Sequence, residues 1–303
     1  MGVPARFQKL LRTGFRALPP ELSPFYRGLF NGEPEDFIRF PCNPPRVSRL
    51  EAWAVKRRSG PMICVVCGEL TQFKIDDDNL RESCRCARCG AMNRNRQIAY
   101  VLCAALSKQL SKPVFSLADV ARYCKEIAIY NTEATGAMHA QLRGLPGYQS
   151  SEYFGRGHRS GDMINGVMHQ DLMELSLSDN SLDIVISSDV FEHIPDPYRA
   201  HQEVHRVLKL GGRHVFTVPF HSQGFLDETR ATLDQEGNPV FLSEPIYHGD
   251  PLSLQGALVY TIFGLEMLVR LRRIGFLTNL FHLSVAWLGI IGPNALVFDA
   301  VKV

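Results

Sequence analysis

The sequence of 303 residues lacks a long apolar run, an excess of charge of one sign and an internal repeat. No stretch reaches the roughly 18 uninterrupted apolar residues that a membrane-spanning helix needs, which argues against a membrane span. Lys and Arg total 33 against 31 Asp and Glu, so the net charge of +2 gives no overall attraction to nucleic acid or to acidic membranes. With 45% hydrophobic and 21% charged residues, the composition excludes a disordered or fibrous protein.

The N-terminus also lacks the apolar run and small-residue cleavage site of a signal peptide. Cysteine, in contrast, is concentrated, because five of the eight cysteines fall between positions 64 and 89. In a chain without an export signal, clustered Cys-x-x-Cys pairs indicate metal ligands in a reducing compartment. We therefore expect a cytoplasmic protein.

Residues 1–60 form a basic N-terminal extension with 11 Lys and Arg against 5 Asp and Glu. Its paired prolines argue against one continuous element. Within residues 6–18, apolar side chains recur at helical spacing among basic ones. This pattern fits a helix at a membrane surface, which would give a peripheral membrane contact. A helix docked on its own domain, with a solvated basic face, is favoured.

Residues 61–95 form a cysteine module with two knuckles, Cys64-Val-Val-Cys67-Gly and Cys86-Ala-Arg-Cys89-Gly, separated by 18 residues. Two such turns facing each other supply the four thiolates that structural Zn²⁺ prefers. Cys84 is a fifth candidate ligand, although its spacing to Cys86 fits a knuckle less well. Five arginines surround the ligands and either bind an anionic substrate or are solvated, the second being favoured: Arg81, Arg85, Arg88, Arg94 and Arg96.

After residue 96, helical patterns alternate with short apolar runs. Helices are predicted over 97–110, 135–142 and 198–208, and strands over 127–130, 148–154, 182–187 and 213–219, with Gly211-Gly212 as a break before the last strand. Segments 281–288 and 295–301 flank Gly292-Pro293-Asn294 as a hairpin. The sequence therefore predicts an α/β fold: a Rossmann-like doubly wound, mostly parallel sheet with a C-terminal antiparallel hairpin, plus a small zinc-ribbon-like module.

The segment 168–220 carries the most specific pattern. It contains Asp171-Leu172, then Ser187-Ser188-Asp189-Val-Phe-Glu-His193, then Arg206-Val-Leu-Lys-Leu-Gly-Gly212 before a buried strand. This run resembles class I S-adenosylmethionine-dependent methyltransferases, specifically the methyltransferase type 11 group. The resemblance covers about residues 120–303. We accordingly expect a methyltransferase domain over 96–303, with an insertion at about 221–256.

The resemblance implies S-adenosylmethionine as cofactor and suggests which residues hold it. Asp171 and Leu172 would contact the adenine, and the segment with Asp189 would close over the methionine end. Only Gly136 remains of the three glycines usual in the family's first loop, where Glu133 fits a Gly-poor variant and would contact the methionine end. Glu152 ends the second strand, where a ribose-binding carboxylate and a solvated loop Glu are about equally favoured.

The acceptor side is predicted from three segments that should meet at the carboxyl edge of the sheet: His193, His221, and the insertion carrying Tyr247-His248-Gly249-Asp250. We expect His221 or His248 to be the general base or an acceptor ligand, and the His248–Asp250 pair is slightly preferred because a carboxylate raises the basicity of an imidazole. A turn histidine bonded to its own loop is the alternative.

The leading hypothesis is methyl transfer to a small molecule or a glycan. Transfer from a sulfonium needs no covalent enzyme intermediate, so a cofactor site and at most one base suffice. One alternative is an RNA or protein methyltransferase that reads its substrate with the zinc module, and a nucleic-acid partner is not favoured. The other is a catalytically degenerate binding protein, which the Gly-poor loop favours and the intact Asp171 and 187–193 segments oppose.

Overall fold

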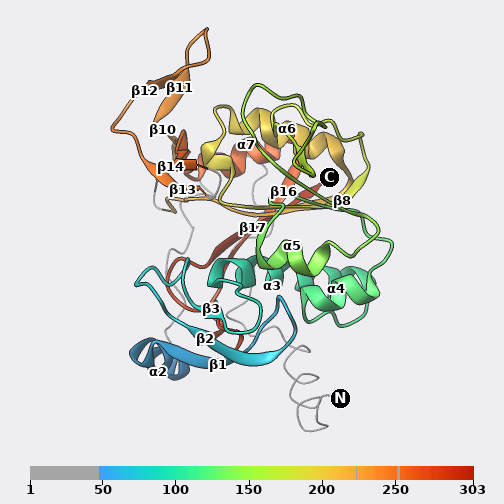
Figure 1. Cartoon of the computed structure of the whole chain (residues 1–303), viewed down its shortest axis with the longest axis vertical. Helices are drawn as coiled ribbons and strands as arrows, with labels where there is room; N and C mark the ends of the chain where they lie inside the picture. The colour runs from blue at the N-terminus through green and yellow to red at the C-terminus, as the bar shows by residue number, and fades with distance from the viewer. Residues whose placement is uncertain (1–47, 223, 251–252) are drawn as a thin grey trace.

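The computed structural model describes residues 48–222, 224–250 and 253–303, so the predicted helix at 6–18 and Cys42 lie outside the described residues. At its centre is an eight-stranded sheet of order β16-β17-β9-β8-β4-β5-β7-β6 (Figure 1). Its strands are β4 Ile129–Asn131, β5 Tyr148–Glu152, β6 Met163–Ile164, β7 Val167–His169, β8 Leu182–Ser188, β9 Leu208–Thr217, β16 Phe276–His282 and β17 Leu296–Lys302. The five strands from β7 to β9 across the sheet run parallel, and β17 and β6 pair antiparallel with their neighbours. The mostly parallel, Rossmann-like sheet is thereby confirmed.

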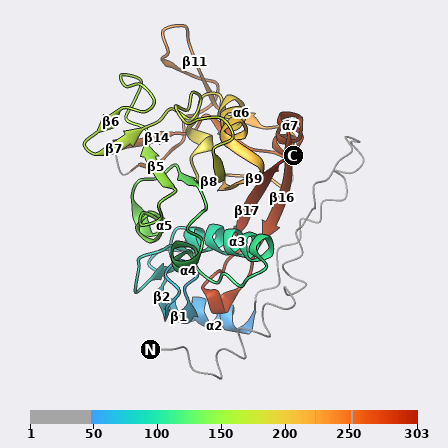
Figure 2. The ribbon, with the colours of Figure 1, turned by 90° about the vertical axis from the view of Figure 1, so that its right-hand side faces the viewer.

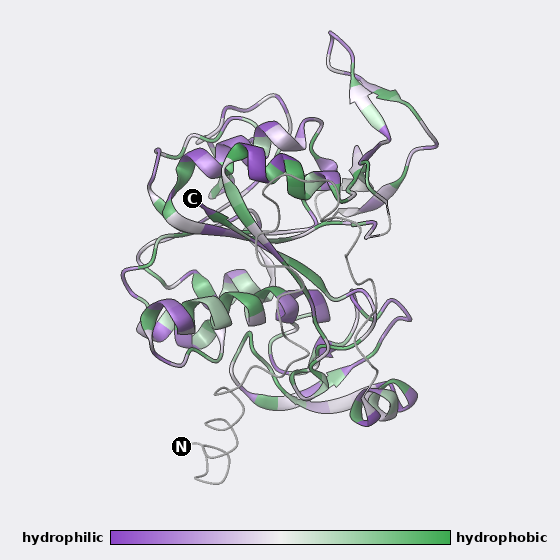
Figure 3. Cartoon of the chain, turned by 180° about the vertical axis from the view of Figure 1, so that it is seen from behind, coloured by the Kyte–Doolittle hydropathy of each residue, from purple (hydrophilic) through white to green (hydrophobic). Residues whose placement is uncertain are grey.

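Helices cover both faces of this sheet (Figures 1 and 2). One layer holds α3 Asn93–Leu110, α4 Leu117–Tyr123 and α5 Gly136–Leu142, and the other holds α6 Pro197–Val207 and α7 Glu266–Ile274. Strand β8 is buried at six of its seven positions, which explains its continuous apolar sequence. Figure 3 shows hydrophobic residues along the strands between the two helix layers.

Side-chain caps decide where the predicted helices begin. The helix predicted at 97–110 is α3, which starts four residues earlier because the Asn95 side chain accepts a hydrogen bond from the Met92 backbone N–H at 3.0 Å. The helix predicted at 198–208 is α6, whose first turn is capped by the Asp196 carboxylate accepting from the Arg199 backbone N–H at 3.0 Å. Both caps satisfy backbone donors that a helix leaves unpaired.

The C-terminal hairpin exists, but its first strand was placed wrongly at 281–288. The strand is β16, which follows directly on Gly275, the residue in left-handed conformation that ends α7. The apolar run from Leu283 to Ile291 is instead a buried turn with a short 3-10 helix at Ala286–Leu288. The run is apolar because it packs against the cysteine module, so its composition resembled that of a strand.

The glycine pair before the last predicted strand lies inside β9. Leu208 pairs with Leu182, and pairing resumes at Arg213 with Ile184, so the four residues 209–212 leave the ladder as a bulge. A Cβ on Gly212 would lie 2.8 Å from the Lys209 carbonyl oxygen, which only glycine avoids. The predicted break is therefore a bulge within a strand that starts earlier than expected.

The cysteine module packs against the buried turn of the C-terminal hairpin. Helix α2 Arg49–Arg57 precedes the module. A three-stranded antiparallel sheet follows, with β1 Ser59–Ile63, β2 Leu70–Lys74 and β3 Arg85–Cys86. The fully buried Arg96 guanidinium donates to the carbonyl oxygens of Ala91 at 2.6 Å, Cys84 at 2.7 Å and Gly289 at 2.8 Å. Module and sheet share one hydrophobic cluster.

The region between β9 and α7 is built from short antiparallel ribbons. They are β10 Glu228–Thr229, β11 Ala231–Leu233, β12 Pro239–Phe241, β13 Tyr247–Asp250, β14 Ser253–Leu258 and β15 Thr261–Ile262. The β11–β12 ribbon projects from the body of the molecule, and β13–β14 lies nearer the sheet (Figures 1 and 2). No helix among the described residues is long and apolar enough to cross a membrane.

Candidate functional site at the carboxyl edge of the sheet

The parallel strands end in polar residues at one edge of the sheet, which is where doubly wound folds bind ligands. Thr132 follows β4, and Ser188 ends the neighbouring β8. Both hydroxyl oxygens are buried, and neither has a hydrogen-bond partner among the described residues. Buried polar groups are normally paired, so two orphaned hydroxyls on adjacent strands indicate a ligand position.

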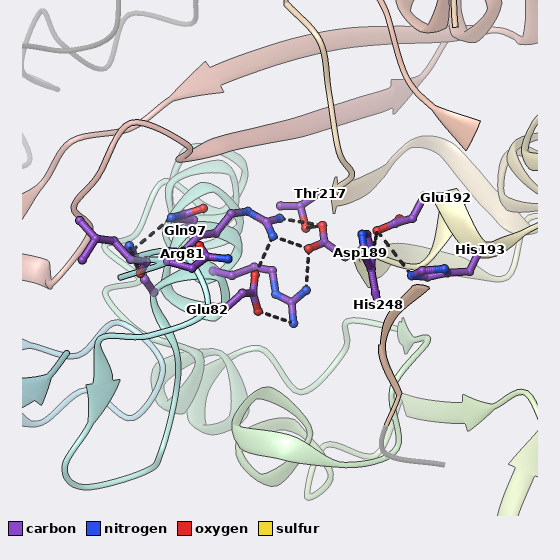
Figure 4. Close-up of polar contacts among 12 residues, drawn as sticks. Arg81, Glu82, Gln97, Asp189, Glu192, His193, Thr217 and His248 are labelled. Carbon is purple, nitrogen blue, oxygen red and sulfur yellow. Dashed lines mark hydrogen bonds and ion pairs between the residues drawn. The ribbon is translucent and has the colours of Figure 1, made fainter. Parts of the chain in front are cut away.

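Asp189 follows Ser188 and is held by two arginines from the cysteine-module side. Its carboxylate accepts from the Arg94 guanidinium at 2.6 Å and from the Thr217 hydroxyl at 2.9 Å (Figure 4). It also accepts from both terminal nitrogens of Arg81, Nη2 at 2.6 Å and Nη1. Burial raises the pKa of the Asp189 carboxyl, but the two guanidinium groups outweigh it and hold that pKa well below its usual range. Asp189 also has φ of +52°, a conformation that non-glycine residues adopt rarely and mostly where structure imposes it.

The module's arginines therefore do not share one role. Arg81 and Arg94 are directed inward to Asp189, and both also pair with Glu82. Arg96 is fully buried and bonds to backbone carbonyls. Only Arg85 and Arg88 are exposed, so the favoured reading of five solvated arginines is wrong for the other three.

A second cluster lies just beyond Asp189 and joins the β8 edge to the insertion. The short 3-10 helix Phe191–His193 carries Glu192, whose carboxylate Oε1 lies 3.7 Å from His193 Nε2 and 3.6 Å from His248 Nδ1 (Figure 4). His248 is on β13 of the insertion. The structure thus brings together two of the three predicted segments.

The remaining predicted acceptor residues are placed differently. His221 is exposed, its backbone N–H donates to the Phe263 carbonyl at 2.8 Å, and no described interaction joins its side chain to the cluster. The side chain of Asp250 lies outside the described part of the structure, so its pairing with His248 stays a prediction.

The loop after β4 carries two of the predicted cofactor residues. Glu133 is largely shielded from solvent, and burial raises the pKa of its carboxyl to about 7 although Arg94 opposes the shift. Gly136 has φ of +78°, and a Cβ there would meet no atom within 4 Å. Glu152, at the end of β5, accepts from the Ala134 backbone N–H at 2.9 Å and so anchors the loop from the neighbouring strand.

Asp171 and Leu172 lie two strands away, after β7. One Asp171 oxygen accepts from the Met173 backbone N–H at 2.8 Å, which fixes the turn, and Leu172 is buried. Because Gln170 donates its backbone N–H to the Glu152 carbonyl, the ends of β5 and β7 lie side by side at the same edge.

The four knuckle cysteines come together in the structure. The Sγ atoms of Cys64, Cys67, Cys86 and Cys89 all lie within 4.8 Å of one another. In each knuckle the glycine after the second cysteine is left-handed and donates its N–H back to the first cysteine's carbonyl, at 2.7 Å for Gly68 and 2.9 Å for Gly90. Cys84 is buried nearby but is not part of this group of four. Four converging thiols suit tetrahedral zinc.

Sequence reasoning missed Glu192, Arg81, Arg94 and Thr217 as site residues. Glu192 stands inside the Asp189-Val-Phe-Glu-His motif, so its position in the motif was an available signal. Arg81 and Arg94 are 108 and 95 residues from Asp189 in sequence, and nothing local links them.

A sequence profile described as "Methyltransferase domain" matches residues 149–216, which run from β5 through β8 and α6 into β9. Over this segment the chain is therefore similar to methyltransferase domains. A curated relative, an uncharacterized methyltransferase from Mycobacteroides abscessus, is 43% identical over 58 residues, which are 19% of this chain. The matched region spans 22% of that relative's length.

Similar solved structures include an S-adenosylmethionine-dependent methyltransferase from Mesorhizobium loti, at 18% identity and a TM-score of 0.36, covering 58% of this chain and 91% of that one. Another is 1,6-didemethyltoxoflavin-N1-methyltransferase from Burkholderia thailandensis, solved with S-adenosylhomocysteine. It is 15% identical with a TM-score of 0.33, covering 60% of this chain and 74% of that one.

Proposed function

We propose that the chain transfers a methyl group from S-adenosylmethionine to a small-molecule or glycan acceptor. The observation that carries this proposal is the pair of orphaned buried hydroxyls, Thr132 and Ser188, at the edge where the strands of the matched methyltransferase segment end. An unpaired buried hydroxyl costs free energy unless a ligand completes it.

The residues at this edge suit the cofactor's separate parts. Glu152 would accept the ribose hydroxyls, because it ends β5 at this edge and its carboxylate accepts hydrogen bonds. Asp171 and Leu172 would hold the adenine, and Glu133 the cationic methionine end. Gly136 leaves open space for backbone to approach the ligand. When bound, S-adenosylmethionine supplies an electrophilic methyl group.

In this proposal Asp189 is a positioning residue. Its carboxylate already accepts from Arg81, Arg94 and Thr217, so it fixes the cysteine-module side against the end of β8. Because Arg81 and Arg94 pair with Asp189 inside the protein, they are not available to bind the phosphates of a nucleic acid. This supports a small-molecule or glycan acceptor. Of the five arginines around the cysteines, only Arg85 and Arg88 remain exposed for contact with a phosphate backbone.

We propose further that the four knuckle cysteines hold one structural zinc ion. A closed set of four thiolates leaves no open coordination position, so the ion would stabilise the module and not take part in methyl transfer. The division into a zinc module at 61–95 and a methyltransferase domain at 96–303 stays a prediction, and the two parts share one hydrophobic cluster.

The cofactor site is tested by the affinity for S-adenosylhomocysteine in matched carboxylate variants. Glu152→Gln and Asp171→Asn should each weaken binding about 10-fold or more, since a hydrogen bond to a charged group contributes about 1.5–3 kcal/mol. Glu174→Gln is the control, because that side chain is 84% exposed and lies near the same edge. Equal affinities in all three variants would remove these residues from the site.

One observation favours a non-catalytic binding protein instead. The loop after β4 is tied to β5 through Glu152 and carries a single glycine, Gly136, so less backbone is free to approach a ligand. A protein that folds normally but binds no S-adenosylhomocysteine would support this second function.

A further inference from the structure

Glu192 is a fully buried carboxylate that the structure leaves without hydrogen bonds. Its side chain is 0% exposed, and neither carboxylate oxygen has a hydrogen-bond donor among the described residues. Its backbone is fixed, because its carbonyl accepts from the Tyr260 N–H at 2.7 Å. An unpaired buried ion costs several kcal/mol, as an order of magnitude, so this carboxyl group must hold a proton or lie beside a cation.

Two imidazoles face this carboxylate from different segments. The nearest ring nitrogens, His193 Nε2 and His248 Nδ1, are 3.7 Å and 3.6 Å from the same Glu192 oxygen, and the two rings are nearly perpendicular at 88°. His193 Nδ1 lies 2.8 Å from the Leu258 carbonyl, to which it can donate only if protonated. That bond directs the other ring nitrogen to Glu192, an arrangement that metal-binding histidines use to fix their tautomer.

The spacing matches a metal centre better than a hydrogen-bonded pair. With metal–ligand bonds of about 2.0–2.1 Å, neighbouring ligands lie about 2.9–3.4 Å apart, so the two Glu192–histidine contacts are within a few tenths of an ångström of that spacing. The three ligand atoms all lie within 4.8 Å of one another. A carboxylate–imidazolium hydrogen bond would instead need one contact near about 2.8 Å and would leave the second histidine unexplained.

We propose that Glu192, His193 and His248 bind one divalent first-row transition-metal ion. One carboxylate and two imidazoles suit Zn²⁺, Mn²⁺ or Fe²⁺. Asp189 is not a fourth ligand, because arginines and Thr217 occupy its oxygens. Three protein ligands leave coordination positions open for an oxygen of another molecule.

This metal site extends the proposed function. It rests on the proposed function only in assigning the oxygen that fills the open coordination position to the methyl acceptor. An acceptor hydroxyl held by the ion would release its proton to solvent water more easily, because the cation would stabilise the oxygen anion that forms. His193 and His248 would then hold the ion and not take the proton themselves. Acceptors with a hydroxyl able to bind a metal, such as polyols or phenols, are the substrate class this site fits.

The test is a Mn²⁺ titration of the full-length protein followed by electron paramagnetic resonance, which reports free Mn²⁺. Mn²⁺ is chosen because it prefers oxygen and nitrogen ligands to four thiolates, so we expect the cysteine site not to bind it. The wild type and the exposed control His158→Ala should each bind one Mn²⁺ per chain. Glu192→Gln and His248→Ala should bind it at least about 10-fold more weakly.

A zinc count covers the case in which the site prefers Zn²⁺. After saturation and desalting, the wild type should retain one zinc more per chain than Glu192→Gln. The proposal is overturned if the wild type binds no Mn²⁺ and its zinc content equals that of Glu192→Gln.

Two further measurements show whether a loss of metal binding comes from unfolding, and whether the metal site can fail while the proposed function holds. Metal-free Glu192→Gln should melt at or above the wild-type temperature, because burying an amide costs less than burying a carboxylate. Loss of metal binding in a variant that melts normally therefore reports the site. S-adenosylhomocysteine binding by a wild type that binds no metal here would overturn the metal site while leaving the proposed function intact.

Discussion

The contact between Asp189 and Arg94 should be worth far more than a surface ion pair of similar geometry. The pair has an N–O distance of 2.6 Å, and its side chains are 14% and 12% exposed. The chain offers a matched control in Arg58–Asp78, at 2.8 Å, whose side chains are 50% and 95% exposed. The two pairs share their chemistry and differ in burial.

Burial sets the expected size of the difference. Unit charges about 4 Å apart interact by about 4 kcal/mol at an effective dielectric constant of about 20, and by about 1 kcal/mol in water. Arg81 remains to compensate Asp189 when Arg94 is removed, which lowers the buried value. We expect a coupling energy of at least about 2 kcal/mol for Arg94–Asp189 and below about 1 kcal/mol for Arg58–Asp78.

Double-mutant cycles to alanine at both pairs measure these couplings. Urea unfolding of each single and double variant, followed by fluorescence and circular dichroism, gives the free energies, provided the two signals report one transition. Equal coupling in the two cycles would refute the reasoning, because burial would then make no difference. A coupling for Arg94–Asp189 below about 1 kcal/mol would refute it as well.

Three shorter predictions follow from other parts of the molecule. Cys89→Ser should lose bound zinc and stability together, whereas Cys84→Ser should keep the ion; elemental analysis that finds full zinc in Cys89→Ser would contradict the four-cysteine assignment. Burial lowers the pKa of His201 to about 3, so the unfolded chain, with a pKa near 6.5, takes up protons first and stability falls as the pH drops below 6.5. His201 alone should contribute a loss of about 2 kcal/mol at pH 5, and His214, whose pKa burial also lowers, adds to it. The loss is seen as a lower urea midpoint than at pH 7, and His201→Leu should make the slope shallower. Once an acceptor is in hand, His248→Ala should lower turnover about 10²-fold or more and His221→Ala much less, because only His248 joins the Glu192 cluster; the reverse order in steady-state kinetics would contradict that placement.

The sequence predicted those parts of the fold that local pattern decides. Strand β8 follows from an apolar run and helix α6 from a helical pattern, and the knuckles follow from cysteine spacing. The hairpin's first strand was misplaced because the run after Leu283 is apolar for a tertiary reason, its packing against the cysteine module.

The site was predictable only where its residues share one segment. His193 and Asp189 stand in the motif after β8, but Asp189's partners come from elsewhere in the chain. That Glu192 is buried without a donor depends on how the insertion packs, which no local pattern encodes. His248 was predicted to pair with Asp250 in the insertion, and the structure adds Glu192 as a second carboxylate beside it.

The proposed function requires that the edge formed by β4, β5 and β8 holds S-adenosylmethionine. Calorimetric titration of the zinc-loaded, full-length protein with S-adenosylhomocysteine tests it most directly. We predict saturable binding of one molecule per chain, weakened in Glu152→Gln and unchanged in Glu174→Gln. Absence of binding to a correctly folded, zinc-loaded protein would contradict the claim.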